Sequence, residues 1–116
     1  MFKKIYLVAE VGCNHMGDLK IAKMLIDQAK QCGADYVKFQ KRDNKILFSK
    51  KEYNSRHPVP QNSFGKTYGE HREFLEFNLN QHKKIISYCI KKKIKYSCSV
   101  WDINSAKTIS GISKEY

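Results

Sequence analysis

YLVAEVGCNHMGDL (residues 6–19) decides the fold, together with YVKFQK (residues 36–41). Apolar and β-branched residues in these stretches predict two buried strands, over 4–10 and 35–40. Between them, apolar residues recur at steps of three and four, which predicts an amphipathic helix over 18–32. Two strands joined through a helix by short connections are expected to pair in parallel.

The rest of the chain continues this alternation after an interruption. Both prolines and many polar residues fall within 41–69, which predicts a long loop without regular structure. Helices are predicted over 70–77 and 80–92, a third strand over 95–100 and a further helix over 104–110.

The order of these elements gives three successive βα units. A closed TIM (β/α)8 barrel contains eight such units in about 250 residues. We therefore expect one α/β domain over residues 1–116 that corresponds to the N-terminal three βα units of a barrel and is truncated. Such a piece is expected to expose an apolar sheet edge and apolar helix faces.

The net charge is +11, from 22 basic and 11 acidic residues. The lysines are scattered rather than gathered in a stripe, so their pattern disfavours nucleic-acid binding and suits a small anionic substrate. No apolar run reaches the roughly 20 residues of a membrane-spanning helix. The N-terminal stretch also lacks the cleavage site of a signal peptide. We expect a cytoplasmic protein that binds neither membranes nor nucleic acid.

The four cysteines, at positions 13, 32, 89 and 98, form no C-x-x-C pair. This spacing disfavours a zinc or thiol-exchange motif. Cys32 and Cys89 fall on apolar helix faces and are expected in the core. Cys13 and Cys98 stand near strand ends, where a small buried or half-buried thiol is the favoured interpretation.

Polar side chains gather at the carboxyl ends of the predicted strands. Because side chains alternate between the two faces of a strand, Glu10, Lys38, Gln40, Ser97 and Ser99 can share one face. In a barrel this face points inward at the rim where catalytic groups lie. The alternative is a Glu10–Lys38 ion pair that only joins two strands. Burying such charges costs several kcal/mol, which favours a functional use.

Asn14 and His15 lie on the loop after the first strand. A histidine there can bind a substrate, cap a helix or pack beneath the loop. The other histidines, at 57, 71 and 82, show no H-x-x-x-H or H-E-x-x-H spacing, so no metal site is predicted from the residues. The G-K-T triplet at 65–67 lacks the upstream glycine of a phosphate-binding P-loop.

Three ordered motifs carry a family resemblance over nearly the whole chain. They are AEVGCNHMGDLKIAKMLIDQAKQCGADYVKFQK (9–41), NSFGKTYGEHREFLEF (62–77) and YSCSVWDINSAK (96–107). Together they closely resemble the N-terminal part of the sialic acid synthase family, the N-acetylneuraminate synthase-like enzymes. The first loop reads N-H-M-G-D-L, which is closer to the N-acetylneuraminate and legionaminate branch than to the N-H-N-Q-S-L of the pseudaminate branch.

The resemblance implies a (β/α)8 barrel that condenses phosphoenolpyruvate with N-acetylmannosamine or a related N-acylated amino sugar. In this family a divalent metal, manganese or magnesium, polarises the sugar aldehyde, carbon 3 of phosphoenolpyruvate attacks it, and phosphate leaves. The resemblance also implies a homodimer. The family's metal ligands lie further along the family sequence than this chain extends. We therefore expect the isolated chain to be inactive, or to complement a separately encoded C-terminal half.

The resemblance also assigns individual residues. Glu10 matches the family's essential first-strand glutamate and is the expected catalytic residue. Lys38 matches a lysine that binds phosphoenolpyruvate. The supporting substrate-binding positions are Gln40, Asn14, His15, Ser97 and Ser99.

Two departures stand out from the family pattern. Met16 replaces the usual Asn of the first loop, and Cys98 is expected to remove a hydroxyl that helps to hold phosphoenolpyruvate. The alternative function, from a different class, is a small basic module without enzymatic activity that binds RNA or another polyanion.

Overall fold

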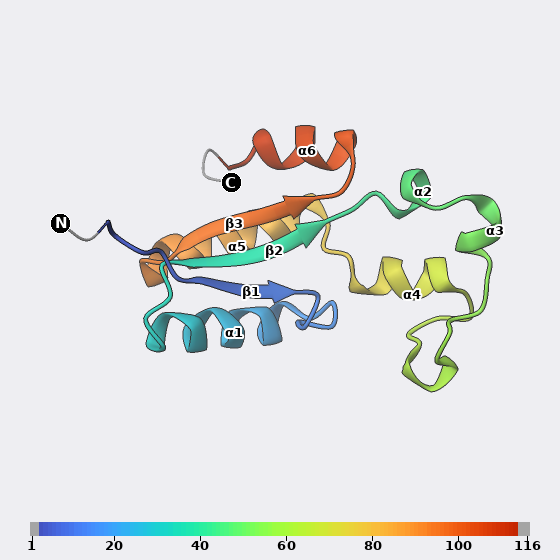
Figure 1. Cartoon of the computed structure of the whole chain (residues 1–116), viewed down its shortest axis with the longest axis horizontal. Coiled ribbons are helices and arrows are strands. Elements are labelled where there is room, and N and C mark those ends of the chain that lie inside the picture. The colour runs from blue at the N-terminus through green and yellow to red at the C-terminus, as the bar shows by residue number, and fades with distance from the viewer. Residues whose placement is uncertain (1–2, 114–116) are drawn as a thin grey trace.

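The computed structural model describes residues 3–113 and contains a parallel sheet of three strands, flanked by helices (Figure 1). The strands are β1 (Val8–Gly12), β2 (Tyr36–Lys41) and β3 (Lys95–Val100). They lie in the order β1-β2-β3, and both pairs are parallel. The prediction of a parallel sheet within three βα units is confirmed.

The helices follow the predicted order. α1 (Leu19–Gln31) leads from β1 to β2, α5 (Leu79–Lys92) leads into β3, and α6 (Ile103–Ser110) follows β3. Asp18 caps α1, because its side chain accepts a hydrogen bond from the backbone N–H of Lys20. The segment between β2 and α5 contains α2 (Asn44–Leu47), α3 (Lys50–Tyr53), the 3-10 turn η1 (Pro60–Asn62) and α4 (Tyr68–Leu75). The ends of α1, α4, α5 and α6 agree with the predicted ones to within two residues.

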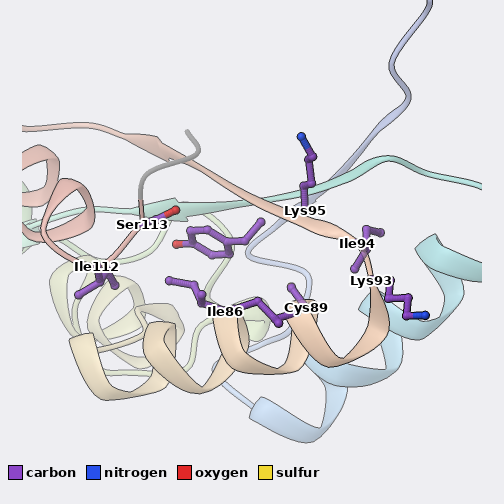
Figure 2. A pocket seen from close by; sticks show the side chains of 9 residues that line it. Ile86, Cys89, Lys93, Ile94, Lys95, Ile112 and Ser113 are labelled. Carbon is purple, nitrogen blue, oxygen red and sulfur yellow. The ribbon is translucent and has the colours of Figure 1, made fainter.

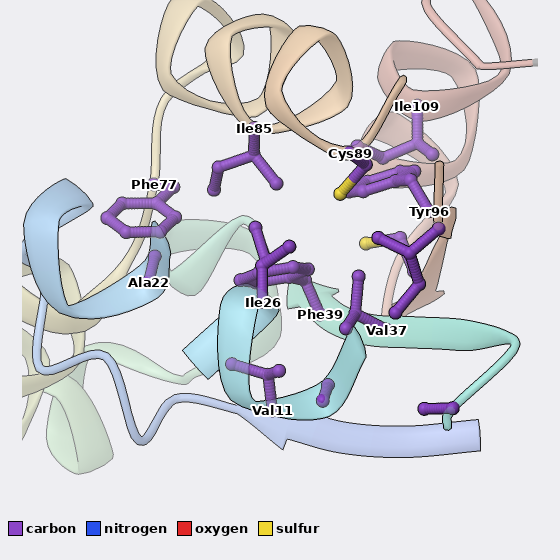
Figure 3. Close-up of a cluster of buried hydrophobic side chains, with 14 residues drawn as sticks. Val11, Ala22, Ile26, Val37, Phe39, Phe77, Ile85, Cys89, Tyr96 and Ile109 are labelled. Atoms are coloured by element: carbon purple, nitrogen blue, oxygen red, sulfur yellow. The ribbon is translucent and has the colours of Figure 1, made fainter. Parts of the chain in front are cut away.

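One face of the sheet is apolar and packs against α1, α5 and α6 (Figure 3). Val37 and Phe39 of β2 are fully buried there. They meet Ile26 of α1, Ile85 of α5 and Ile109 of α6 in one cluster. The burial of this cluster supplies the main hydrophobic stabilisation of the fold. It also leaves the opposite face of the sheet to the polar side chains that alternate with Val37 and Phe39.

The prediction of a strand over 4–10 was wrong at both ends, since β1 runs from Val8 to Gly12. Ile5, predicted to be buried, is 89% exposed. Leu7 is also exposed, although its carbonyl oxygen accepts hydrogen bonds from the backbone N–H groups of Asp35 and Tyr36. Residues 3–7 have no continuous backbone ladder with β2 and therefore do not form a strand.

The prediction of a structureless loop over 41–69 was also wrong. Short helices form there because the sequence carries local caps. Ser49 and Glu52 form a capping box at α3, and Thr67 of the G-K-T triplet forms another at α4. The ring of Tyr53 lies directly against Gly69, where a Cβ atom would come within 2.3 Å of the ring. This contact joins α3 to α4.

Cys32, predicted in the core, is exposed, because α1 ends at Gln31 and Cys32 is only its C-cap. Cys89 is buried as predicted. The predicted exposure of apolar surface is confirmed by Ile90 of α5, at 72% exposed, and by Val100 of β3, at 41%. No helix within residues 3–113 has the length and apolar character that crossing a bilayer requires.

Candidate functional site at the carboxyl ends of the strands

Glu10 and Lys38 form an ion pair across β1 and β2. Lys38 Nζ lies 2.7 Å from Glu10 Oε2. The two residues are direct partners in the strand register, and Ser97 of β3 is the next partner of Lys38. Gln40 is paired in the same way with Ser99. The predicted sharing of one sheet face by these five residues is confirmed.

The polar face is open rather than buried. The side chains of Lys38 and Glu10 are 35% and 49% exposed, and Gln40, Ser97 and Ser99 are half-buried. An ion pair at this exposure contributes no more than about 1 kcal/mol to stability. Lys38 can therefore exchange the Glu10 carboxylate for another anion at little cost to the fold.

The loop after β1 is held by local hydrogen bonds. The side-chain amide of Asn14 donates to the Val11 carbonyl over 2.9 Å, and the remainder of the exposed side chain faces solvent. Met16 has a φ of 51°, in the left-handed region that Asn tolerates better than most residues. The departure from the family's usual Asn therefore places a less suitable residue at a strained turn.

His15 lies beneath this loop and is only 2% exposed. Its ring stacks on Phe77 with centroids 3.8 Å apart, and its Nδ1 accepts a hydrogen bond from the Gly17 backbone N–H over 3.0 Å. Burial lowers the pKa of His15 to about 4, although a hydrogen bond with the Gly12 backbone acts to raise it. The ring is thus neutral and supports the loop from below.

Cys98 does not face Lys38. Alternation along β3 places its side chain on the helix-covered face, where it is 7% exposed and belongs to the core cluster. Burial raises the pKa of this thiol to about 11. The expectation that Cys98 removes a hydroxyl from the substrate face was therefore wrong, since Ser97 and Ser99 hold the positions on that face.

Sequence reasoning missed a second ion pair at the end of β2. Lys41 Nζ lies 3.2 Å from Glu76 Oε1, and the two side chains are 15% and 7% exposed. The same oxygen accepts a hydrogen bond from the Arg42 backbone N–H over 3.0 Å. Burial raises the pKa of Glu76, although Lys41 and the Arg42 N–H oppose that effect. These bonds join the end of α4 to the end of β2. The only signal for them in the sequence was Glu76 itself, a carboxylate between two apolar residues in L-E-F (75–77).

A cavity of about 530 Å³ lies at the other end of the sheet, at the start of β3 (Figure 2). Figure 2 shows Ile86 and Cys89 of α5 on one side of it and Ile112 on another. Its lining is mainly apolar, and the lysines at its edge belong to the turn before β3 and to its first residue. The cavity is therefore separate from the polar residues at the carboxyl ends of the strands.

A profile of the NeuB family matches residues 25–115. The chain belongs to the NeuB family. This membership agrees with the resemblance expected from the three motifs, and it covers most of the described structure.

This chain is 43% identical over 101 residues to the N-acetylneuraminate-9-phosphate synthase of Mus musculus. The match covers 84% of this chain and 27% of the relative. The chain is 32% identical over 108 residues to the N,N'-diacetyllegionaminic acid synthase of Campylobacter jejuni, with 93% of this chain and 32% of the relative covered. The chain thus spans about a third or less of the length of these relatives.

Solved structures show the same fold. The N-acetylneuraminic acid (sialic acid) synthetase of Leptospira borgpetersenii superposes with a TM-score of 0.73 at 22% identity, over 96% of this chain and 34% of that one. The spore coat polysaccharide biosynthesis protein SpsE of Bacillus subtilis superposes with a TM-score of 0.64 at 26% identity, over 96% of this chain and 28% of that one. Three βα units of the NeuB-family chain therefore correspond to about 30% of these proteins.

The buried histidines predict an acid-sensitive fold. His82 is fully buried, its Nδ1 lies 2.8 Å from the Tyr96 hydroxyl, and burial lowers its pKa to about 4, as for His15. The unfolded chain, with pKa values near 6.5, binds more protons between pH 4 and 6.5. The free energy of unfolding should therefore fall as the pH is lowered through this range, by about 1 kcal/mol per pH unit for each histidine.

Urea unfolding at a series of pH values measures this slope. The raised pKa of Glu76 acts in the opposite direction and reduces the total slope. His82→Gln should remove the part of the slope that His82 contributes, while His15 and His71, whose pKa values burial also lowers, keep theirs. A wild-type stability that stays constant between pH 6.5 and 4.5 would contradict the neutral, buried state of both rings.

Proposed function

We propose that this chain supplies the phosphoenolpyruvate-binding part of a synthase that condenses phosphoenolpyruvate with N-acetylmannosamine or a related N-acylated amino sugar to give a sialic (nonulosonic) acid. The observation that carries the proposal is the open ion pair of Glu10 and Lys38 at the carboxyl ends of two parallel strands. Family membership and the names of the relatives support the choice of reaction.

The residues of the polar face suit a small, highly charged substrate. Lys38 would leave Glu10 and bind the phosphate or carboxylate of phosphoenolpyruvate, because a dianionic group offers a stronger partner than a half-exposed carboxylate. The Gln40 amide and the hydroxyls of Ser97 and Ser99 would donate further hydrogen bonds. Glu10, released from Lys38, would act as the catalytic residue that orients water or a substrate hydroxyl.

The resemblance also implies a divalent metal, manganese or magnesium. Residues 3–113 contain no group of three or more His, Cys, Asp or Glu residues that could hold one. His15 is unsuited to such a role, because its Nδ1 already accepts the Gly17 N–H and its ring also bonds to the Gly12 backbone. The described residues therefore do not fit the metal.

The remaining expectations concern the complete enzyme. A homodimer, a complementing C-terminal half and a cytoplasmic location remain predictions. In this proposal His15 and Asn14 support the site by holding the first loop, and the substrate contacts come from the strand ends. The binding of RNA or another polyanion remains the alternative function, and salt-dependent binding of the chain to RNA would favour it.

Lys38→Met tests the proposed role of the ion pair. Phosphoenolpyruvate titrated into the chain should bind about tenfold more weakly to this variant, because one charge-assisted hydrogen bond is lost. Glu10→Gln should bind at least as tightly as the wild type, since Lys38 then has no competing carboxylate. Isothermal titration calorimetry measures both affinities.

Lys84→Met is the matched control, because Lys84 is an exposed lysine on α5 far from β2 in sequence. It should leave phosphoenolpyruvate binding unchanged. Equal affinities for Lys38→Met and Lys84→Met would show that the Glu10–Lys38 pair only joins two strands.

The 116 residues are expected to release no phosphate from phosphoenolpyruvate when supplied with N-acetylmannosamine and manganese. The physical reason is that residues 3–113 offer no cluster to hold the metal that polarises the aldehyde. A continuous assay for inorganic phosphate measures this. Sustained turnover by the chain alone would overturn the view that it supplies only part of the site.

A further inference from the structure

Two arginines converge on one sulfur atom close to the carboxyl end of β2. Arg42 Nη1 and Arg72 Nη2 each lie 3.6 Å from Cys13 Sγ. Arg42 follows β2, Arg72 belongs to α4, and Cys13 follows β1, so three elements bring these groups together. The two nitrogens are therefore no further apart than twice the distance from either to the sulfur.

Neither guanidinium forms an ion pair within residues 3–113, although the Arg42 charge helps to hold down the pKa of Glu76. Every ion pair found in this part of the chain has a lysine as its cation. A thiol is only a weak hydrogen-bond acceptor. Glu76, which bonds to the Arg42 backbone, is already engaged with Lys41. Two half-buried cations thus face one another across a weak acceptor, an arrangement that an anion between them would stabilise.

The guanidinium groups are also held in place. The Arg42 guanidinium lies over the Trp101 ring, 4.1 Å from its centroid, which fixes the plane of the group. Cys13 Sγ in turn donates to Gln40 Oε1 over 3.6 Å. Since Gln40 and Lys38 share the polar face of β2, Cys13 connects the two arginines to the face that carries the Glu10–Lys38 pair. A ligand on the polar face could extend to them.

We propose that Arg42 and Arg72 form a second phosphate-binding site, distinct from Lys38. The planar fork of a guanidinium matches the oxygens of a phosphate group, and two such forks suit a dianion. The ligand of this site is either a phosphate ester carried by the sugar or inorganic phosphate. Only this choice of ligand rests on the proposed function. The chemistry recognised is the same in both cases. Cys13 holds the place of the anion in the free protein.

Isothermal titration calorimetry tests this site. The chain is titrated with inorganic phosphate, with N-acetylmannosamine 6-phosphate and with N-acetylmannosamine. Arg42→Gln and Arg72→Gln should each weaken phosphate binding about tenfold, the value of one charge-assisted contact. Arg42→Lys keeps the positive charge but lacks the planar fork of the guanidinium. Its affinity for phosphate should therefore lie between those of the wild type and Arg42→Gln. Arg56→Gln removes an exposed arginine and should have no effect. Thermal melting of each variant verifies folding.

The source of the ligand follows from the wild-type affinities. Tighter binding of the sugar phosphate than of inorganic phosphate supports a site for a phosphorylated sugar, and equal affinity supports a site for free phosphate. In both cases the Arg42→Gln and Arg72→Gln variants must bind the phosphate group more weakly than the wild type does. Binding that is unchanged in folded Arg42→Gln, Arg42→Lys and Arg72→Gln proteins overturns the proposal, as does a loss of the phosphate response in Lys38→Met.

The two proposals fail separately. Phosphoenolpyruvate binding that survives Lys38→Met contradicts the proposed function while leaving the arginine site intact. Inorganic phosphate binding that survives both arginine substitutions contradicts the arginine site while leaving the assignment of Lys38 intact.

Discussion

The structure depends on the position of β2 between two parallel neighbours. β2 pairs with β3 along its whole length and with β1 over residues 36–39, where the register shifts between Glu10 and Gly12. This pairing on both sides holds its register, and successive side chains must point to opposite faces. Val37 and Phe39 go to the helices, and Lys38 and Gln40 go to the other face. A shift of one residue would bury a lysine and expose a phenylalanine. The packing of α1 and α5 therefore also aligns Lys38 with Glu10.

This constraint explains why much of the fold and site could be predicted. Periodicity of two in Y-V-K-F-Q-K and of three to four in the helices is local information, and burial enforces it. The placement of Glu10 beside Lys38 follows once the strands are known to be parallel. The same rule places Cys98, which alternates with Ser97 and Ser99, on the face opposite to them, and the buried or half-buried thiol expected at this position is confirmed.

Features that depend on contacts between distant segments could not be predicted in this way. Ile5 looks like a core residue, but no continuous ladder holds its segment against β2. Cys13 and Arg72 are separated by 59 positions, and they meet only because the segment after β2 folds into short helices. That folding rests on capping boxes and on the fit of Gly69 beneath Tyr53. His15 likewise needs Phe77 to define its packing.

We propose that the polar face of the sheet, at the carboxyl ends of the strands, is the substrate surface. The most direct measurement is a titration of the ¹⁵N-labelled chain with phosphoenolpyruvate, followed by NMR spectra of the backbone amides. If this face binds the substrate, the largest shifts will fall on Gly12, Lys38, Gln40 and Ser99. Largest shifts at the apolar cavity around Ile86 and Ile94, or no shifts at all, would contradict it.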